Sequence, residues 1–218
     1  MIPPKTNVYI DGFNFYYGCY KNSLHPGDKA HKWLDVSAFC IAALPDHHIH
    51  RIKYFTAKVS GTPQDPQQPL RQELFLRALR TCQHPKVNVY FGHFLTTKKT
   101  GKIITSTGLS NHLSTIRIFE EKGSDVNLAT ELLVDGYEAD YEVAVVISND
   151  SDLAGPIRVV RQRLKRDVHV LNPHSNTSTV MKKVASSYRE VPRQYLATCQ
   201  FPPVLQDRTG QFRKPSSW

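Results

Sequence analysis

One uninterrupted apolar run constrains the fold of this chain more than any other stretch. Residues 143–147 read Val-Ala-Val-Val-Ile, and the polar residues Ser-Asn-Asp-Ser-Asp follow directly at 148–152. A short β-branched run that ends at turn-forming residues is typical of a strand buried on both faces of a helix-covered parallel sheet. Ligands bind beyond the carboxyl ends of such strands, so the sequence predicts a site at Asp150 and Asp152.

The same arrangement occurs near the start of the chain. The strand-forming residues 7–10 run directly into Asp-Gly-Phe-Asn at 11–14. We expect these two strands to be neighbours in one sheet, because that pairing brings their polar ends together. Asp11 is then predicted to share one site with the acids that follow the later strand.

Hydrophobic periodicity predicts strands that alternate with helices along most of the chain. Strands are expected at 7–10, 51–59, 87–95, 143–147 and 168–171, with a further short strand at 116–119. Helices are expected at 13–20, 35–44, 69–82, 125–137, 153–164 and 179–186. This order predicts an α/β fold with a parallel, Rossmann-like sheet that has helices on both faces.

The alternating pattern occupies residues 1–190, which we interpret as one domain. Within it, residues 96–114 are rich in lysine, serine and threonine and predict a basic hairpin or a mobile loop inserted into the fold. From residue 191 to residue 218 the pattern fades. This C-terminal extension is predicted to be an arm or a disordered tail.

The charge balance indicates an anionic partner. The formal net charge is +9, and nucleic acid is favoured over a membrane because no basic amphipathic segment stands apart from the fold. No apolar run approaches the roughly 18 residues of a membrane helix, and the expected location is cytoplasmic. The four cysteines are scattered, which signals neither a zinc site nor a disulfide framework. The basic side chains expected to contact phosphates are Lys98, Lys99, Lys102, Arg158, Arg161, Lys165, Lys182 and Lys183.

Three separate places in the sequence supply the acids of the predicted site. Asp11 and the pair Asp150 and Asp152 follow strands, whereas Asp125 opens a helix. Clustered carboxylates repel one another, and a hard divalent cation such as Mg²⁺ or Mn²⁺ removes that cost. Such an ion can activate a water molecule and neutralise charge on a phosphate. Glu131 lies further along the same helix and need not face the same ion, so we rank it below the aspartates.

The residues around these acids resemble the three motifs of the NYN domain, a branch of the PIN-like nucleases. They are Asp-Gly-Phe-Asn at 11–14, Lys-Gly-Ser-Asp-Val-Asn-Leu-Ala at 122–129 and Ser-Asn-Asp-Ser-Asp-Leu at 148–153. The three stand in the family's order over residues 7–186. The resemblance implies a PIN-like sheet and a Mg²⁺- or Mn²⁺-dependent endoribonuclease that hydrolyses phosphodiester bonds of RNA.

The resemblance also implies roles for single residues. The principal metal-binding acids would be Asp11, Asp125 and Asp150, with Asp152 assisting and Asn14 positioning water or phosphate. Glu131 stands where the family more often has aspartate, which leaves the reach of that carboxylate open. Asn149 stands where glycine is common, and asparagine tolerates the left-handed backbone that a glycine there would supply.

Alternatives remain open at this stage. Asp150 and Asp152 can instead be N-caps of the helix that begins near Leu153. A catalytically inactive module that binds RNA or a protein partner would have the same fold. A hydrolase of the haloacid dehalogenase type fits less well, because Phe13 stands where that chemistry needs a second aspartate. The choice between RNA and DNA, the number of ions and the formation of a homodimer are also left open.

Overall fold

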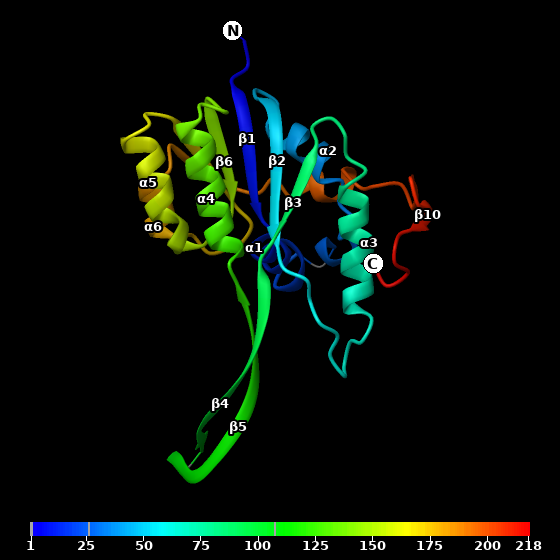
Figure 1. Cartoon of the computed structure of the whole chain (residues 1–218), viewed down its shortest axis with the longest axis vertical. Coiled ribbons are helices and arrows are strands. Elements are labelled where there is room, and N and C mark those ends of the chain that lie inside the picture. The colour runs from blue at the N-terminus through cyan, green and yellow to red at the C-terminus, as the bar shows by residue number, and fades with distance from the viewer. Residues whose placement is uncertain (1, 26, 107) are drawn as a thin grey trace.

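A parallel sheet forms the centre of the molecule, as the sequence predicts, and it has six strands (Figure 1). The computed structural model describes residues 2–25, 27–106 and 108–218. In the order β3-β2-β1-β6-β7-β8, the strands are Val87–Phe91, His48–Thr56, Lys5–Asp11, Val143–Ile147, Asp167–Asn172 and Ser187–Glu190. All five pairings between neighbouring strands are parallel.

The two strands that carry the predicted acids are neighbours, so this expectation is confirmed. In the register of β1 and β6, Ile10 lies opposite Ile147, and both strands end at the same edge of the sheet. The chain adds β2 and β3 on one side of β1 and then crosses to β6 on the other side. This reversal of strand order makes the carboxyl ends of β1 and β6 a topological switch point, and ligands of open α/β sheets bind beyond the strand ends at such a point.

Helices cover both faces of the sheet and bury a separate core on each (Figure 1). One face holds α4 (Ser124–Tyr137), α5 (Ala154–Gln162) and α6 (Thr179–Val184). The other face holds α2 (Val36–Ala43), α3 (Gln68–Leu79), α7 (Gln194–Thr198) and the consecutive turns α1 (Gly12–Tyr16) and η1 (Tyr17–Lys21). Short turns η2 (Asp28–Ala30) and η3 (Ser151–Leu153) complete the helical elements of the described residues.

The apolar run of β6 is buried on both faces, because its side chains alternate between the two cores. Val145 and Ile147 belong to the core beneath α2 and α3, whereas Ala144 and Val146 belong to the core beneath α4 and α5. This is the arrangement that the unbroken apolar sequence predicts. Within the described ranges, none of the helices has the length and apolarity that crossing a bilayer requires.

Residues 96–114 lie in a long antiparallel hairpin of β4 (His93–Thr105) and β5 (Gly108–Lys122). The hairpin projects from the carboxyl edge of the sheet, downward in Figure 1. With 13 residues in β4, it reaches on the order of 40 Å from its base. The strand expected at 116–119 is part of β5 and does not join the main sheet. Residue 107, within the predicted hairpin or loop, lies outside the described residues.

The C-terminal extension is an arm docked on the body. After α7, strands β9 (Val204–Asp207) and β10 (Gly210–Arg213) form a small hairpin. The indole nitrogen of Trp33 donates to the carbonyl oxygen of Pro202 at 2.9 Å, and Phe212 enters the core beneath α2 and α3. Strand β8, which precedes the arm, was missed by the sequence pattern because it is a short, mostly exposed edge strand with three polar residues among its four.

Candidate active site

Asp11 ends β1 and is held rigidly at the switch point. Its Oδ1 accepts a hydrogen bond from the Asn14 backbone nitrogen at 2.9 Å, and its Oδ2 accepts one from Ser148 Oγ at 3.0 Å. The carboxylate therefore caps α1 and also joins the end of β1 to the end of β6. Only 4% of Asp11 is exposed, and this burial, together with the charges of Asp125 and Asp150, raises its pKa to about 7.

Asp125 lies in the first turn of α4 with no capping task. The N-cap of α4 is Gly123, whose φ of 92° suits a residue without a Cβ atom. The backbone nitrogen of Ser124 donates instead to Glu121 Oε1 at 3.0 Å. Burial raises the pKa of Asp125 to about 6, and the charges of Asp150, Glu121 and Asp152 add to this rise.

Asp150 caps a helical turn, as one of the two alternatives has it, and its carboxylate also acts on the other predicted acids. Its Oδ1 accepts from the Asp152 backbone nitrogen at 2.9 Å, so it caps η3. Its own backbone nitrogen donates to Ser148 Oγ at 3.1 Å, the hydroxyl that also binds Asp11. The charge of Asp150 raises the pKa of both Asp11 and Asp125, so it lies within their electrostatic reach.

Each of the four predicted aspartates lies within electrostatic reach of at least one of the others, and we call them the aspartate cluster: Asp11, Asp125, Asp150 and Asp152. Across the described residues, no three His, Cys, Asp or Glu side chains converge closely enough to hold a metal ion by themselves. The donor set nevertheless fits Mg²⁺ or Mn²⁺ held by one or two carboxylates, with water and phosphate oxygens as the remaining ligands. A cation would also offset the repulsion that raises the pKa of Asp11 and Asp125.

Sequence reasoning missed two residues beside the aspartate cluster. Glu121 is one, and the signal for it was available, because it stands just before the Lys-Gly-Ser-Asp motif. His174 is the other, and its Nε2 lies 3.1 Å from Asn14 Oδ1. Burial lowers the pKa of His174, and the charge of Arg193 adds to this. An isolated histidine in a loop carries no sequence signal of its own.

Asn14 and Asn149 hold the loops around the cluster in place. Asn14 Oδ1 accepts from the Asn149 backbone nitrogen at 2.9 Å. Asn149 Oδ1 in turn accepts from the Tyr188 hydroxyl at 2.7 Å and from the Ser178 backbone nitrogen at 3.2 Å. Asn149 is not among the described residues with positive φ, so a left-handed backbone is not the reason for asparagine here. Its side chain instead ties the loop after β6 to the start of α6.

Glu131 lies beside a buried lysine and not beside the aspartate cluster. Lys53 Nζ contacts Glu131 Oε2 at 2.6 Å and Asp135 Oδ2 at 2.6 Å, and only 4% of Lys53 is exposed. The Tyr9 hydroxyl also donates to Asp135, at 2.5 Å. We call Lys53, Glu131, Asp135 and Tyr9 the lysine network. Glu131 is therefore neutralised by a partner on β2.

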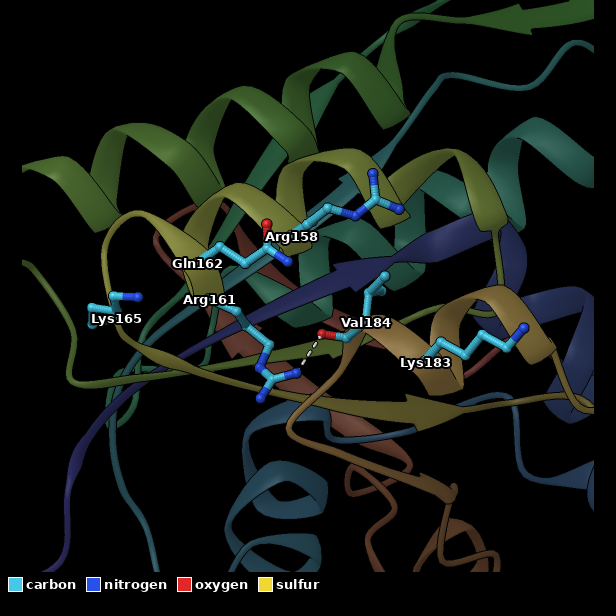
Figure 2. A pocket seen from close by; sticks show the side chains of 6 residues that line it. All are labelled: Arg158, Arg161, Gln162, Lys165, Lys183 and Val184. Atoms are coloured by element: carbon cyan, nitrogen blue, oxygen red, sulfur yellow. Dashed lines mark hydrogen bonds between the residues drawn. The ribbon is translucent and has the colours of Figure 1, made fainter.

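Basic side chains line a pocket of about 470 Å³ between α5 and α6, which we call the basic pocket (Figure 2). Its described lining contains no acidic residue and consists of Arg158, Arg161, Gln162, Lys165, Lys183 and Val184. Arg161 is partly committed to the fold, because it donates to the carbonyl oxygens of Val184 and Ala185 at 3.0 and 3.1 Å. Lys182 is exposed on α6 and is not among the described lining residues.

The three predicted lysines of the insertion are exposed on β4 of the hairpin. Lys99 pairs with Glu120 of β5 at 3.0 Å. Lys98 and Lys102 lie four residues apart and share the other face of the strand. Neither forms an ion pair within the described part of the chain, so their charges face solvent.

Comparisons with known proteins give three findings. The pattern of the NYN domain matches residues 5–192. The 6-hydroxy-3-succinoylpyridine 3-monooxygenase HspA of Pseudomonas putida (strain DSM 28022 / S16) is 30% identical over 243 aligned positions, which cover 99% of this chain and 76% of that protein. The crystal structure of a protein of unknown function, VPA0982 from Vibrio parahaemolyticus RIMD 2210633, matches with a TM-score of 0.55 at 17% identity. That match covers 87% of this chain and 94% of the other, and it shows a shared fold.

Proposed function

This chain belongs to the NYN domain family, and we propose that it is a metal-dependent endoribonuclease that hydrolyses phosphodiester bonds of RNA. The observation that carries the proposal is the aspartate cluster at the carboxyl ends of β1 and β6. Its buried members have raised pKa values, and groups of strongly perturbed acids are typical of catalytic sites. The family generally contains nucleases, which is the chemistry that such a cluster suits.

Asp11, Asp125 and Asp150 would hold Mg²⁺ or Mn²⁺, with Asp152 at the exposed rim. A bound ion of this kind polarises a phosphoryl oxygen and lowers the pKa of a bound water molecule. Asp11 is suited to the task because hydrogen bonds from Ser148 and from the Asn14 backbone fix its two oxygens. With pKa values of about 7 and 6, Asp11 and Asp125 are partly protonated near neutral pH, so cation binding releases protons.

Two basic surfaces are candidates for contacts with the phosphates of the substrate. Helix α5 follows η3 directly, so the basic pocket lies along the helix that starts at Asp150 and Asp152. The hairpin with Lys98 and Lys102 projects from the same edge of the sheet (Figure 1). Both surfaces carry cations that can bind phosphates of a strand that also reaches the cluster, which supports an extended single strand as the substrate.

The proposal is tested with purified protein, labelled single-stranded RNA and DNA of the same sequence. We expect internal cleavage of the RNA in the presence of Mg²⁺ or Mn²⁺ and none with chelator. Equal cleavage by Asp150→Asn would overturn the assignment of the site. Metal-independent RNA binding without cleavage would instead favour an inactive RNA-binding module of the same fold.

A second candidate, oxygenation of a small aromatic compound, is favoured by one observation. The relative that is 30% identical over 99% of this chain is named a 6-hydroxy-3-succinoylpyridine 3-monooxygenase. The direct test supplies this pyridine, a reduced nicotinamide nucleotide and oxygen to the same protein preparation. Oxygen uptake that matches the loss of the pyridine would favour this candidate over the nuclease.

A further inference from the structure

A second pocket has a volume of about 470 Å³, and aromatic side chains form much of its walls. It is formed by α1, η1, the loop between β2 and α3, the base of the hairpin and the C-terminal arm. Its aromatic lining includes Tyr16, Tyr17, Tyr54, Phe75, Phe94 and Trp218. We call it the aromatic pocket. Its size is that of a small-molecule site, and a mostly apolar wall with a few polar groups is usual for such sites.

Ring contacts between different elements build these walls. Phe75 of α3 packs edge-on against Trp218 with ring centres 5.9 Å apart, and it meets Tyr54 of β2 at 6.1 Å. At the other side, Tyr16 and Tyr17 meet edge-on at 5.8 Å. Tyr17 is 38% exposed, and Lys21 Nζ lies over its ring at 4.8 Å from the centre, which leaves the uncovered part of the ring for a ligand. Aromatic walls of this kind accept a flat ring by stacking or edge contact.

The aromatic pocket lies next to the aspartate cluster along the chain and in space. Gly12, which follows Asp11 directly, is part of its lining. A Cβ atom on Gly12 would lie 2.7 Å from the Tyr54 ring and 2.7 Å from the Phe55 carbonyl oxygen, so only glycine allows this close approach. The residue that follows Asp11 is therefore part of the pocket wall and packs directly against Tyr54.

The charged groups of the pocket favour an anion. Lys32, Arg71 and Asp65 line it, and Arg71 forms an ion pair with Asp65. Lys32 is half-buried and forms no ion pair with any described residue. Burial lowers the pKa of Lys32, and repulsion from Arg71 and Lys29 adds to this, which is the situation that a bound anion relieves.

We propose that the aromatic pocket binds a planar aromatic ring that carries an anionic group, with the ring between the aromatic walls and the anion at Lys32. Two sources have this chemistry: a nucleotide of an RNA strand, with its base and phosphate, and a small heteroaromatic acid. The inference does not rest on the nuclease proposal, because it is carried by the pocket and not by the aspartates.

The experiment measures binding by calorimetry to the full chain in the presence of chelator, so that the aspartate cluster cannot contribute through a metal. Uridine monophosphate and nicotinate represent the two sources. Uridine and nicotinamide, which lack the anion, and inorganic phosphate, which lacks the ring, are the matched controls. We expect saturable binding of at least one complete probe and at least about tenfold weaker binding of its incomplete controls.

Variants locate the binding site. Lys32→Gln should weaken the complete probe about tenfold, and Tyr17→Ala should weaken it by roughly five- to thirtyfold. Lys86→Gln removes the same charge just before β3, at the amino edge of the sheet, is not among the described lining residues, and should change the affinity less than about twofold. Asp150→Asn should bind as well as the unchanged protein, whether or not RNA cleavage is observed.

The outcomes separate the sources and decide the proposal. Preference for the nucleotide assigns the pocket to a base of the RNA, and preference for nicotinate assigns it to a small aromatic acid. The proposal is overturned if neither probe binds saturably at millimolar concentration, or if Lys32→Gln and Tyr17→Ala both bind unchanged. The ligand series decides the question even where a variant has a lowered melting temperature.

Discussion

The two edges of the parallel sheet place aspartates in opposite electrostatic situations. At the carboxyl edge, burial and neighbouring acids raise the pKa of Asp11 to about 7 and of Asp125 to about 6. At the amino edge, burial also acts to raise the pKa of Asp140, but hydrogen bonds from Asn7, Lys5 and Arg51 outweigh it and lower the value to about 2. The chain itself therefore neutralises the acid at the amino edge. The acids at the carboxyl edge still repel one another, and a bound cation would offset that repulsion.

The same contrast between unpaired and neutralised acids occurs within helix α4. Asp125 in its first turn is crowded by other acids, whereas Glu131 and Asp135 further along contact Lys53. A fold can neutralise a buried acid by placing a cation on a neighbouring strand, as β2 does here. None of the four acids of the aspartate cluster forms an ion pair with a described residue, which is why we propose this cluster, and not the lysine network, as the functional site.

The largest expected effect comes from exchanging one acid at each edge. Asp150→Asn should lower RNA cleavage by roughly a thousandfold, because it removes a carboxylate from the ion while asparagine still caps η3. The matched variant Asp140→Asn should stay within about threefold of the unchanged protein. Cleavage rates under single-turnover conditions measure both. Equal losses for the two variants would end the distinction between the edges.

Removing the internal cation tests the lysine network. Lys53→Met leaves Asp135 and Glu131 without their partner and should lower the free energy of unfolding by about 3 kcal/mol, measured by urea denaturation. Lys86→Met removes an exposed lysine and should change it by less than about 0.5 kcal/mol. Similar values for the two variants would show that Lys53 does not neutralise these acids.

The pH dependence of stability should have opposite signs at the two edges. In metal-free protein, the free energy of unfolding should fall as the pH rises from about 4 to about 7, because folded Asp11 and Asp125 keep protons that the unfolded chain has released. Asp140 has a lowered folded pKa, so its contribution is present above about pH 4 and is lost as the pH falls toward about 2.

Two variants separate these contributions. Asp125→Asn should reduce the fall between about pH 4 and pH 7 by about 1 to 2 kcal/mol, whereas Asp140→Asn should leave it unchanged. Thermal or urea unfolding over a pH series with chelator gives the profiles. A profile for Asp125→Asn that runs parallel to that of the unchanged protein would contradict a raised pKa at this position.

The smallest expected effect concerns the charges beyond the carboxyl edge. Neutralising Lys98, Lys99 and Lys102 together should weaken RNA binding several-fold at low salt and reduce its salt dependence by about one unit of slope for each lost phosphate contact. Because Lys99 is paired with Glu120, Lys98 and Lys102 should account for most of the change. An unchanged slope would remove the hairpin from the RNA-binding surface.

Local pattern was sufficient for much of the fold. The unbroken apolar run of β6 and the turn residues after it predicted a buried strand, and the order of strands and helices predicted the parallel sheet. The edge strand β8 was not predictable in this way, because it pairs only with β7 and is too polar to carry an apolar period. The C-terminal arm gave no period either, since its contacts with Trp33 are to residues far away in the sequence.

The candidate site was likewise predictable from the sequence in one respect and not in another. The sequence by itself determined that acids stand at Asp11, Asp125, Asp150 and Asp152, since each follows or opens a regular element. Tertiary structure alone decided which acids are neutralised, because the deciding contacts join distant parts of the chain. Ser148 binds Asp11 from 137 positions away, and Lys53 binds Glu131 from 78 positions away. The pKa of a carboxylate depends on its burial and on its neighbours in space, and the adjacent residues of the sequence determine neither.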